Sequence, residues 1–189
     1  MNYGALKFCD IANGPGVRIS LFVSGCEHYC KGCFNSEAWD FSFGEIYTDK
    51  ISEEILKELG KNYVKGISIL GGEPFHPKNQ LEVFNLIQKI RSRYSCEEKD
   101  IWVYSGYLFE DLYSGNVGEY SRDIIENIDI LVDGQFKIDL KDIGLNFRGS
   151  SNQRIIDIKK SLESNKIVLH PLGIGDSNKY NKEITNESM

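Results

Sequence analysis

Three of the chain's five cysteines fall in the segment GCEHYCKGCF, which runs from Gly25 to Phe34. Cys26, Cys30 and Cys33 follow the spacing CxxxCxxC. A closed structural metal site normally uses four protein ligands, and this segment supplies three thiols. Thiolates also hold iron–sulfur clusters, and three of them can bind three irons of a 4Fe-4S cluster while the fourth iron stays open. The spacing therefore indicates a metal centre with one ligand still to be supplied.

Zinc is the alternative occupant of this cysteine segment. Short cysteine clusters often bind zinc, and a Cys₃His site takes one histidine as its fourth ligand. His28 lies inside the segment and His76 lies further along the chain. The cysteines alone leave both the cluster and the zinc site open.

A second motif, GGEP at residues 71–74, ends an apolar run. Adjacent glycines let a ligand approach the backbone closely and leave amide N–H and C=O groups to bond it. Glu73 adds a carboxylate that could accept an ammonium group. The Gly-Lys-Ser/Thr ending of a phosphate-binding loop is absent. By itself the motif is also compatible with an ordinary turn.

The composition excludes several classes of partner. Lys and Arg number 22 against 28 Asp and Glu, and the net charge of −6 gives no electrostatic basis for binding nucleic acid or an anionic membrane. No stretch approaches the roughly 20 apolar residues of a membrane helix, and the first residues lack the apolar core of a signal peptide. We therefore expect a cytoplasmic protein with reduced cysteines, in which close-set thiols bind metal. Cys9 and Cys96 stand alone and are predicted to be buried.

Apolar runs of strand length alternate with longer segments of helical periodicity. The expected strands are 18–24, 66–72, 101–107, 128–134 and 165–173, and the expected helices are 52–59, 79–94 and 119–128. This alternation predicts an α/β fold with a mostly parallel sheet. The 189 residues are expected to form one domain over 1–175, followed by a polar, mobile tail over 176–189.

Several polar motifs follow the expected strands. They are the cysteine segment, GGE, Ser105-Gly106 and Asp133-Gly134. Ligands of parallel sheets bind at the loops that leave the carboxyl ends of the strands, so these motifs predict one site at one edge. Ser105 and Asp133 are candidates for hydrogen bonds to a ribose or a carboxylate, although Ser and Asp beside Gly are also common turn residues.

Together, CxxxCxxC and GGEP resemble the radical S-adenosylmethionine superfamily. The residues Asp10, Asn13-Gly14-Pro15-Gly16, Arg18, Phe22 and Gly25 are similar to the opening signature of glycyl-radical-enzyme activating proteins. Within that group, the resemblance is to the anaerobic ribonucleoside-triphosphate reductase activating family. The stretches that carry it are VSGCxHxCxGCxN (23–35), GGEPxHP (71–77), DIWVYSGY (100–107), LVDGQF (131–136), DLKD (139–142) and RGSSNQR (148–154).

The resemblance implies a partial (βα) barrel and a specific chemistry. Cys26, Cys30 and Cys33 would hold one 4Fe-4S cluster, and S-adenosyl-L-methionine would chelate the open iron. Its reductive cleavage would give a 5′-deoxyadenosyl radical that abstracts a hydrogen atom from a glycine of the reductase large chain. The implied electron donor is a reduced flavodoxin or ferredoxin, and the implied setting is anaerobic.

The family pattern also implies which residues hold S-adenosylmethionine. They are Gly32, Cys33 and Phe34 against the adenine, and Gly71, Gly72 and Glu73 at the methionine amino group. Many superfamily members have an aromatic residue where this chain has Gly32; here the aromatic residue is Phe34, as in the reductase-activating group. Arg148 and Arg154 of RGSSNQR are candidates to face the partner protein, and a helix-capping turn is the alternative for that stretch.

Two alternative functions are also compatible with the sequence, and each makes a different prediction. A radical S-adenosylmethionine enzyme acting on a small molecule, such as a deazaguanine-forming synthase, would turn over without a protein partner. A zinc-binding interaction module would hold one colourless ion and would not bind S-adenosylmethionine.

Overall fold

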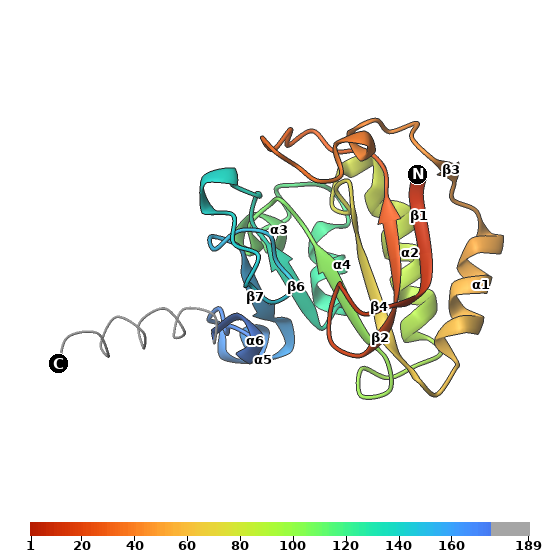
Figure 1. Ribbon diagram of the computed structural model, residues 1–189. Coiled ribbons are helices and arrows are strands. Elements are labelled where there is room, and N and C mark those ends of the chain that lie inside the picture. Colours follow the sequence, from red (N-terminus) through yellow and green to blue (C-terminus); the bar gives the residue numbers. More distant parts are fainter. Residues whose placement is uncertain (175–189) are drawn as a thin grey trace.

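Four parallel strands form the centre of the sheet in the computed structural model, which describes residues 1–174 (Figure 1). They are β2 (Val17–Val23), β4 (Val64–Gly71), β5 (Asp100–Tyr104) and β6 (Ile130–Asp133), side by side in that order. Each lies within or across one of the strands expected from the apolar runs. The predicted mixed α/β fold with a mostly parallel sheet is therefore confirmed.

Antiparallel strands end the sheet on both sides. β1 (Asn2–Asp10) pairs with β2 and carries the short β3 (Glu45–Ile46), while β7 (Arg154–Asp157) pairs with β6. Over the described residues the order is β3-β1-β2-β4-β5-β6-β7, an open sheet, so the partial barrel is not confirmed. The predicted domain boundary after residue 175 and the predicted mobile tail over 176–189 lie outside the described residues.

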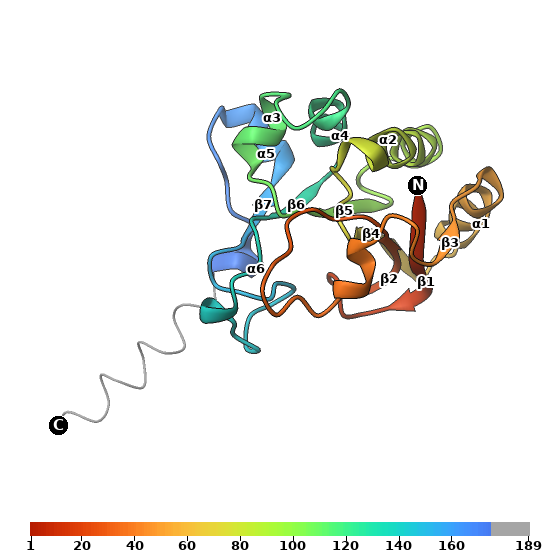
Figure 2. The ribbon, with the colours of Figure 1, turned by 90° about the horizontal axis from the view of Figure 1, so that it is seen from above.

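Helices supply the crossovers between the parallel strands. Figure 2 shows α2, α3 and α4 along one face of the sheet, with α6 on the opposite side. No helix within residues 1–174 is long and apolar enough to cross a membrane. The helices are α1 (Asp49–Leu59), α2 (Pro77–Arg91), α3 (Phe109–Tyr113), α4 (Ser121–Asn127), α5 (Ile158–Ser164) and α6 (Pro171–Ile174), with 3₁₀ turns η1 (Ser36–Trp39) and η2 (Ile138–Leu140).

The expected strand at 165–173 is wrong. Asn165 adopts a left-handed conformation that ends α5, and Pro171 begins α6. Between them, a single bridge joins Leu169 to Ile156 of β7. The apolar run was too short, between two residues that favour turns and helix starts, to build a strand of its own. The predicted burial of the two isolated cysteines is also wrong, because Cys9 is exposed and Cys96 is partly exposed.

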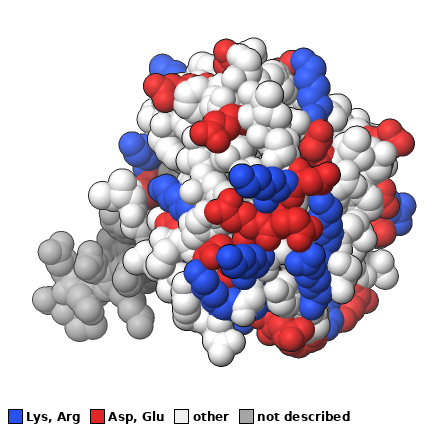
Figure 3. Space-filling view, turned by 90° about the vertical axis from the view of Figure 1, so that its right-hand side faces the viewer, with Lys and Arg blue, Asp and Glu red and all other residues white. Residues whose placement is uncertain are grey.

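Charged side chains of both signs cover the side of the molecule that bears α1 (Figure 3). Ion pairs contribute to this mixture: Lys89 of α2 pairs with Asp49 of α1 at 2.8 Å, and Arg93, just after α2, pairs with Glu53 of α1 at 2.9 Å. This face therefore carries no extended basic surface of the kind that nucleic acid requires.

The two faces of the sheet have different cores. Ile19, Leu21 and Val23 of β2 pack with apolar side chains of α1 and α2 in the larger cluster. Because successive side chains of a strand point to opposite faces, Arg18 and Ser20 face away from these helices. The second, smaller cluster on that other face consists of Trp102, Ile130, Val132 and Ile155.

Arg18 is the most deeply buried charge on this second face. Its side chain is fully buried, forms an ion pair with Asp100 and lies over the ring of Trp102. Its guanidinium also donates to Ser68 Oγ and to the carbonyl of Ile67, at 2.9 Å each. Strands β2, β4 and β5 are thus joined by one side chain.

Replacing Arg18 with methionine is expected to destabilise the fold by about 3–5 kcal/mol, because Asp100 then loses its partner in a largely desolvated place. Arg122→Met is the matched control. Arg122 pairs with Glu126 on the surface of α4, and such a pair contributes about 0.5 kcal/mol or less. Chemical denaturation of the two variants measures both effects, and equal losses of stability would contradict this account of Arg18.

Candidate active site

The carboxyl ends of the four parallel strands surround a cavity of about 130 Å³. The cysteine loop follows β2, the GGE segment ends β4, and Ser105 and Gly134 follow β5 and β6. Of the residues predicted from the sequence, those that line this cavity are Cys26, Cys30, Cys33, Phe34, Gly71, Gly72, Glu73 and Ser105. Parallel strands thus bring segments that are far apart in the sequence to one place.

The three cysteines share this cavity without converging on one point. Within residues 1–174, no three Cys, His, Asp or Glu side chains are gathered closely enough to hold a single metal ion. A cubane cluster attaches each cysteine to a different iron, so its ligands are spread more widely than the four ligands of one zinc ion. The described thiols thus line one cavity but are not gathered around one point as the ligands of a single zinc ion are.

Both histidines considered as a fourth zinc ligand already have partners. His28 Nε2 lies 2.8 Å from a Glu73 oxygen, and its Nδ1 lies 2.9 Å from Gln135 Nε2. His76 caps α2, where its Nδ1 accepts from the N–H of Lys78 at 3.2 Å. Both ring nitrogens of His28 and the Nδ1 of His76 are thus already engaged within the chain.

The chain's own groups act on the thiols in opposite directions. Burial raises the pKa of Cys26 to about 12, and a backbone hydrogen bond from His28 opposes the shift. Burial likewise raises the pKa of Cys30, and the backbone of Phe136 opposes that shift by a hydrogen bond. Thiols of this kind are protonated near neutral pH, so binding of iron must displace their protons. Once the thiolates are formed, the same N–H groups stabilise their charge.

Glu73 is a buried carboxylate whose acceptor sites are filled. Its side chain is 1% exposed. Oε1 accepts from Phe75 N and Ser105 Oγ, at 2.9 Å each. Oε2 accepts from Gly106 N at 2.7 Å and lies 2.8 Å from His28 Nε2. A carboxylate offers about four lone-pair sites, so these four contacts occupy the Glu73 side chain, which joins three loops of the site.

Gly71 and Gly72 of GGE pack closely against the backbone at the end of β2 and in the loop after it. Gly72 N donates to Val23 O at 2.7 Å, and Glu73 N donates to Gly25 O at 2.8 Å. A Cβ on Gly71, whose φ is +111°, would lie 2.6 Å from Val23 O, and one on Gly72 would lie 2.6 Å from Gly25 O. The N–H groups of Gly72 and Glu73 are therefore not free for a ligand, contrary to expectation. The glycines instead allow the cysteine loop to pack directly against the end of β4.

Ser105 and Asp133 both have intramolecular partners. Ser105 donates to Glu73 and accepts from Tyr107 N at 3.0 Å. Asp133 is fully buried, and its carboxylate accepts from Phe109 N at 2.8 Å and from Arg154 Nε at 2.9 Å. Ser105 lines the cavity. Asp133 does not line it but supports the loop beneath the cavity, and the neighbouring residue Gly134 forms part of the wall.

The arginines of RGSSNQR are held within the chain rather than directed at a partner. Arg154 joins Asp133 to Glu110, with Glu110 Oε2 at 2.8 Å. Arg148 donates to the carbonyls of Gln153 and Gly173 at 2.8 and 3.1 Å. This stretch therefore braces the loop that follows β6.

A larger cavity of about 390 Å³ adjoins the first and shares Cys33, Phe34 and Tyr104 with it. Its wall includes Gly32 and the loop 141–149, and most of the exposed wall is apolar. Phe34 is 88% exposed, so it is a rim residue and not part of the core. The hydroxyl of Tyr104 is buried with no hydrogen-bond partner within the described chain, and burial raises its pKa.

Sequence reasoning missed Tyr104 as a site residue, because Tyr104 was counted only as part of a strand. His28 was expected to be a solvated residue or a neighbour of the metal ligands rather than a ligand itself. The signal that could have identified Tyr104 was its position next to Ser105 at the end of an expected strand, where successive side chains alternate between the two faces of the sheet.

Comparison with known proteins points to one family. The pattern of the 4Fe-4S single cluster domain matches residues 12–156. The anaerobic ribonucleoside-triphosphate reductase-activating protein of Escherichia coli K12 is 43% identical over 155 residues, covering 81% of this chain and 96% of that protein. Proteins of the same name are 41% identical in Vibrio cholerae, over 82% of this chain and 97% of the relative, and 37% identical in Enterobacteria phage T4, over 82% and 93%.

Proposed function

The chain belongs to the family of anaerobic ribonucleoside-triphosphate reductase-activating proteins, and on that premise we propose that it forms a glycyl radical on the reductase. In this proposal Cys26, Cys30 and Cys33 hold a 4Fe-4S cluster, with S-adenosyl-L-methionine at its open iron. The protein substrate is the large chain of the reductase. The observation that carries the proposal is that three thiols and a buried carboxylate line one cavity, which opens into a larger apolar one.

When bound, the reduced cluster and S-adenosylmethionine together supply a 5′-deoxyadenosyl radical, which takes a hydrogen atom from a glycine Cα. The chain's task is to hold the reactants close together and to keep water away from the radical. The cavity supports both tasks, because its wall is built from four strand ends, and the hydrogen bonds of Glu73 fix the loops after three of them, β2, β4 and β5.

Glu73 contributes charge to cofactor binding. With its acceptor sites filled, it attracts the methionine ammonium as a buried negative charge rather than as an empty hydrogen-bond acceptor. Ser105 holds that carboxylate in place. Gly71 and Gly72 keep the end of β4 close to the cysteine loop.

The adjoining cavity is the natural place for the adenosyl group and the glycine that reacts. Phe34 lines both cavities and Gly32 lines the larger one, which supports their assignment to the adenine. Phe34 and Ile143 are 88% and 96% exposed, so part of the wall is left for the reductase to complete. Asp133 acts from beneath the site through Arg154, in place of the direct contact with ribose or carboxylate expected from the sequence.

The electron comes in this proposal from a reduced flavodoxin or ferredoxin. Cys30 is partly exposed, so a cluster at this loop lies near the surface, where a donor protein can approach. Thiolate ligands and a reduced cluster fit an anaerobic cytoplasm.

Anaerobic reconstitution with iron and sulfide, followed by dithionite and S-adenosylmethionine, tests the proposal. We expect roughly four irons per chain and release of methionine and 5′-deoxyadenosine. A colourless protein that holds one zinc ion and leaves S-adenosylmethionine intact would contradict it and favour the interaction module. Turnover of a small molecule in the absence of the reductase would favour the deazaguanine synthase-like alternative.

A further inference from the structure

We propose that His28 is a positioning residue that fixes the cysteine loop, which follows β2, against the loops at the ends of the other three parallel strands. It lies in the loop after β2, midway between Cys26 and Cys30. Nε2 contacts Glu73 after β4 at 2.8 Å, and Nδ1 contacts Gln135 after β6 at 2.9 Å. The inference rests on the proposed function, because it takes this loop to be the one that carries the cluster.

The loop after β5 completes the set of contacts around the imidazole. The His28 ring meets the ring of Tyr107 edge-on, with the centroids 4.5 Å apart. A Cβ on Gly106 would lie 2.4 Å from His28 Cδ2, so this position accommodates only glycine without displacing the ring. His28 is therefore enclosed by the strand ends rather than projecting into solvent.

The hydrogen bonds define the chemical state that this role requires. An ionised carboxylate can only accept, so Nε2 carries a proton and donates to Glu73. Nδ1 then accepts from the side-chain amide of Gln135. One side chain thus links the cysteine loop to the carboxylate of the cofactor cavity on one side and to the loop of Phe136 on the other.

Both links bear on the cluster ligands. The backbone of Phe136, next to Gln135, hydrogen-bonds the Cys30 sulfur, and the backbone of His28 itself hydrogen-bonds the Cys26 sulfur. Fixing His28 therefore fixes two donors that face two ligand sulfurs. Partners of this kind, one contact removed from the metal, orient the ligands, and their loss typically lowers metal affinity about 10–100-fold.

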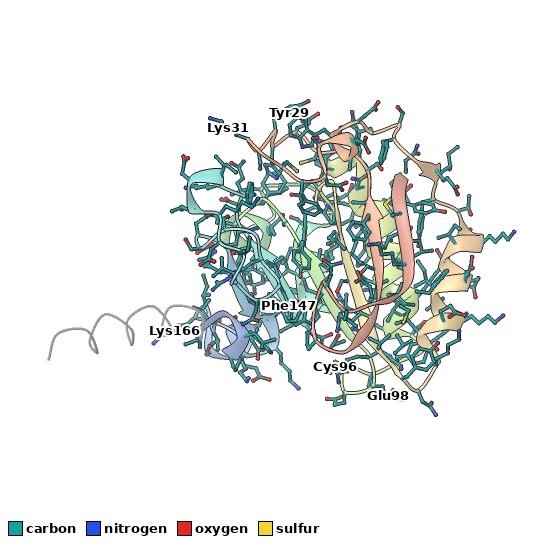
Figure 4. All side chains as sticks on the ribbon, viewed as in Figure 1. Tyr29, Lys31, Cys96, Glu98, Phe147 and Lys166 are labelled. Carbon is teal, nitrogen blue, oxygen red and sulfur yellow. The ribbon has the colours of Figure 1, made fainter. Side chains whose placement is uncertain are left out.

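Two substitutions separate the hydrogen bonds of His28 from its packing. His28→Phe keeps a ring between Tyr107 and Gly106 but removes both hydrogen bonds. His28→Gln loses the ring but places an amide N–H where Nε2 donates to Glu73. Tyr29→Phe is the matched control, since Tyr29 is 62% exposed and points away from the sheet at the outer end of the loop (Figure 4).

The test is made on reconstituted full-length protein by measuring the rate of iron loss to a chelator and the change in the spectrum of the reduced cluster on addition of S-adenosylmethionine. We expect His28→Phe to lose iron at least about tenfold faster and to lack the spectral change. Tyr29→Phe should stay close to wild type in both. His28→Gln keeps the bond to Glu73 but loses the bond to Gln135, so it should lie between wild type and His28→Phe.

Two results would overturn the role of His28: His28→Phe behaving like wild type, or His28→Gln being as impaired as His28→Phe. If His28→Phe does not fold, Gln135→Leu provides the test, because it removes the hydrogen-bond partner of Nδ1 by changing an exposed residue. Faster iron loss in this variant supports the role of His28, and an unchanged rate refutes it. A wild-type protein that binds no cluster would refute the proposed function instead.

Discussion

Replacing Cys26, Cys30 or Cys33 singly with serine is expected to abolish cluster binding and cleavage of S-adenosylmethionine. Each thiol serves a different iron of the cubane, so no remaining cysteine can substitute for the lost one. The loss of a direct ligand should exceed the about 10–100-fold cost of losing a supporting partner. Iron and sulfide analysis after anaerobic reconstitution, together with an assay for 5′-deoxyadenosine, measures both effects.

The two isolated cysteines provide matched controls. Cys9 lies on β1, and Cys96 lies at the opposite end of the molecule from the cysteine loop, whose Tyr29 and Lys31 mark the other end in Figure 4. Cys9→Ser and Cys96→Ser should bind the full complement of iron and cleave the cofactor at the wild-type rate. If either control lost the cluster, or any of the three loop variants kept it, the ligand assignment would be wrong.

Glu73→Gln is expected to impair both the fold of the site and cofactor binding. The glutamine NH₂ would face two donors whichever way the amide is turned, because each Glu73 oxygen accepts two hydrogen bonds. An unmatched buried donor costs about 1–3 kcal/mol. The negative charge that attracts the ammonium is lost as well, so we expect affinity for S-adenosylmethionine to fall at least about tenfold, equivalent to about 1.4 kcal/mol.

Equilibrium binding to the reconstituted protein and denaturant unfolding of the metal-free protein separate these two effects. Glu126→Gln is the matched control, since Glu126 lies on the surface of α4 and contacts only solvent and Arg122 among the pairs described. It should leave the affinity unchanged and alter stability by less than about 0.5 kcal/mol. Wild-type affinity in Glu73→Gln would contradict the role given to this carboxylate.

The central strands and the place of the site could be predicted because their signals are local. The runs that became β2, β4, β5 and β6 are apolar and end at glycine or polar turns, which is typical of buried parallel strands. The carboxyl ends of such strands must meet at one edge, so the sequence alone predicts that the cysteine loop and GGE lie close together.

The partners of individual side chains could not be predicted, because they depend on the packing of segments far apart in the sequence. Asp133 looks like a ligand-binding aspartate at a strand end, but Arg154 of the antiparallel β7 binds it. That pairing requires β7, which follows a long loop and has only the short sequence RIID. His28 likewise meets Gln135 across 107 positions of sequence.

The edge strands of the sheet could not be predicted for a related reason. β1 mixes apolar and polar residues irregularly around Gly4, and its register with β2 shifts twice. Its strand conformation comes from pairing with β2 rather than from its own pattern. Over the described residues the sheet has antiparallel strands at both ends, and the expected partial barrel is not confirmed.

The central claim is that this chain makes a glycyl radical on its partner, and electron paramagnetic resonance on the anaerobic mixture tests it most directly. Reconstituted protein, reductant, S-adenosylmethionine and the large chain of the reductase should together give a protein radical signal. Because a glycyl radical keeps one α-hydrogen, the signal should be a doublet that collapses when the reductase carries glycine deuterated at Cα. Cofactor cleavage with no such signal, or a signal unaffected by the deuterium, would contradict the claim.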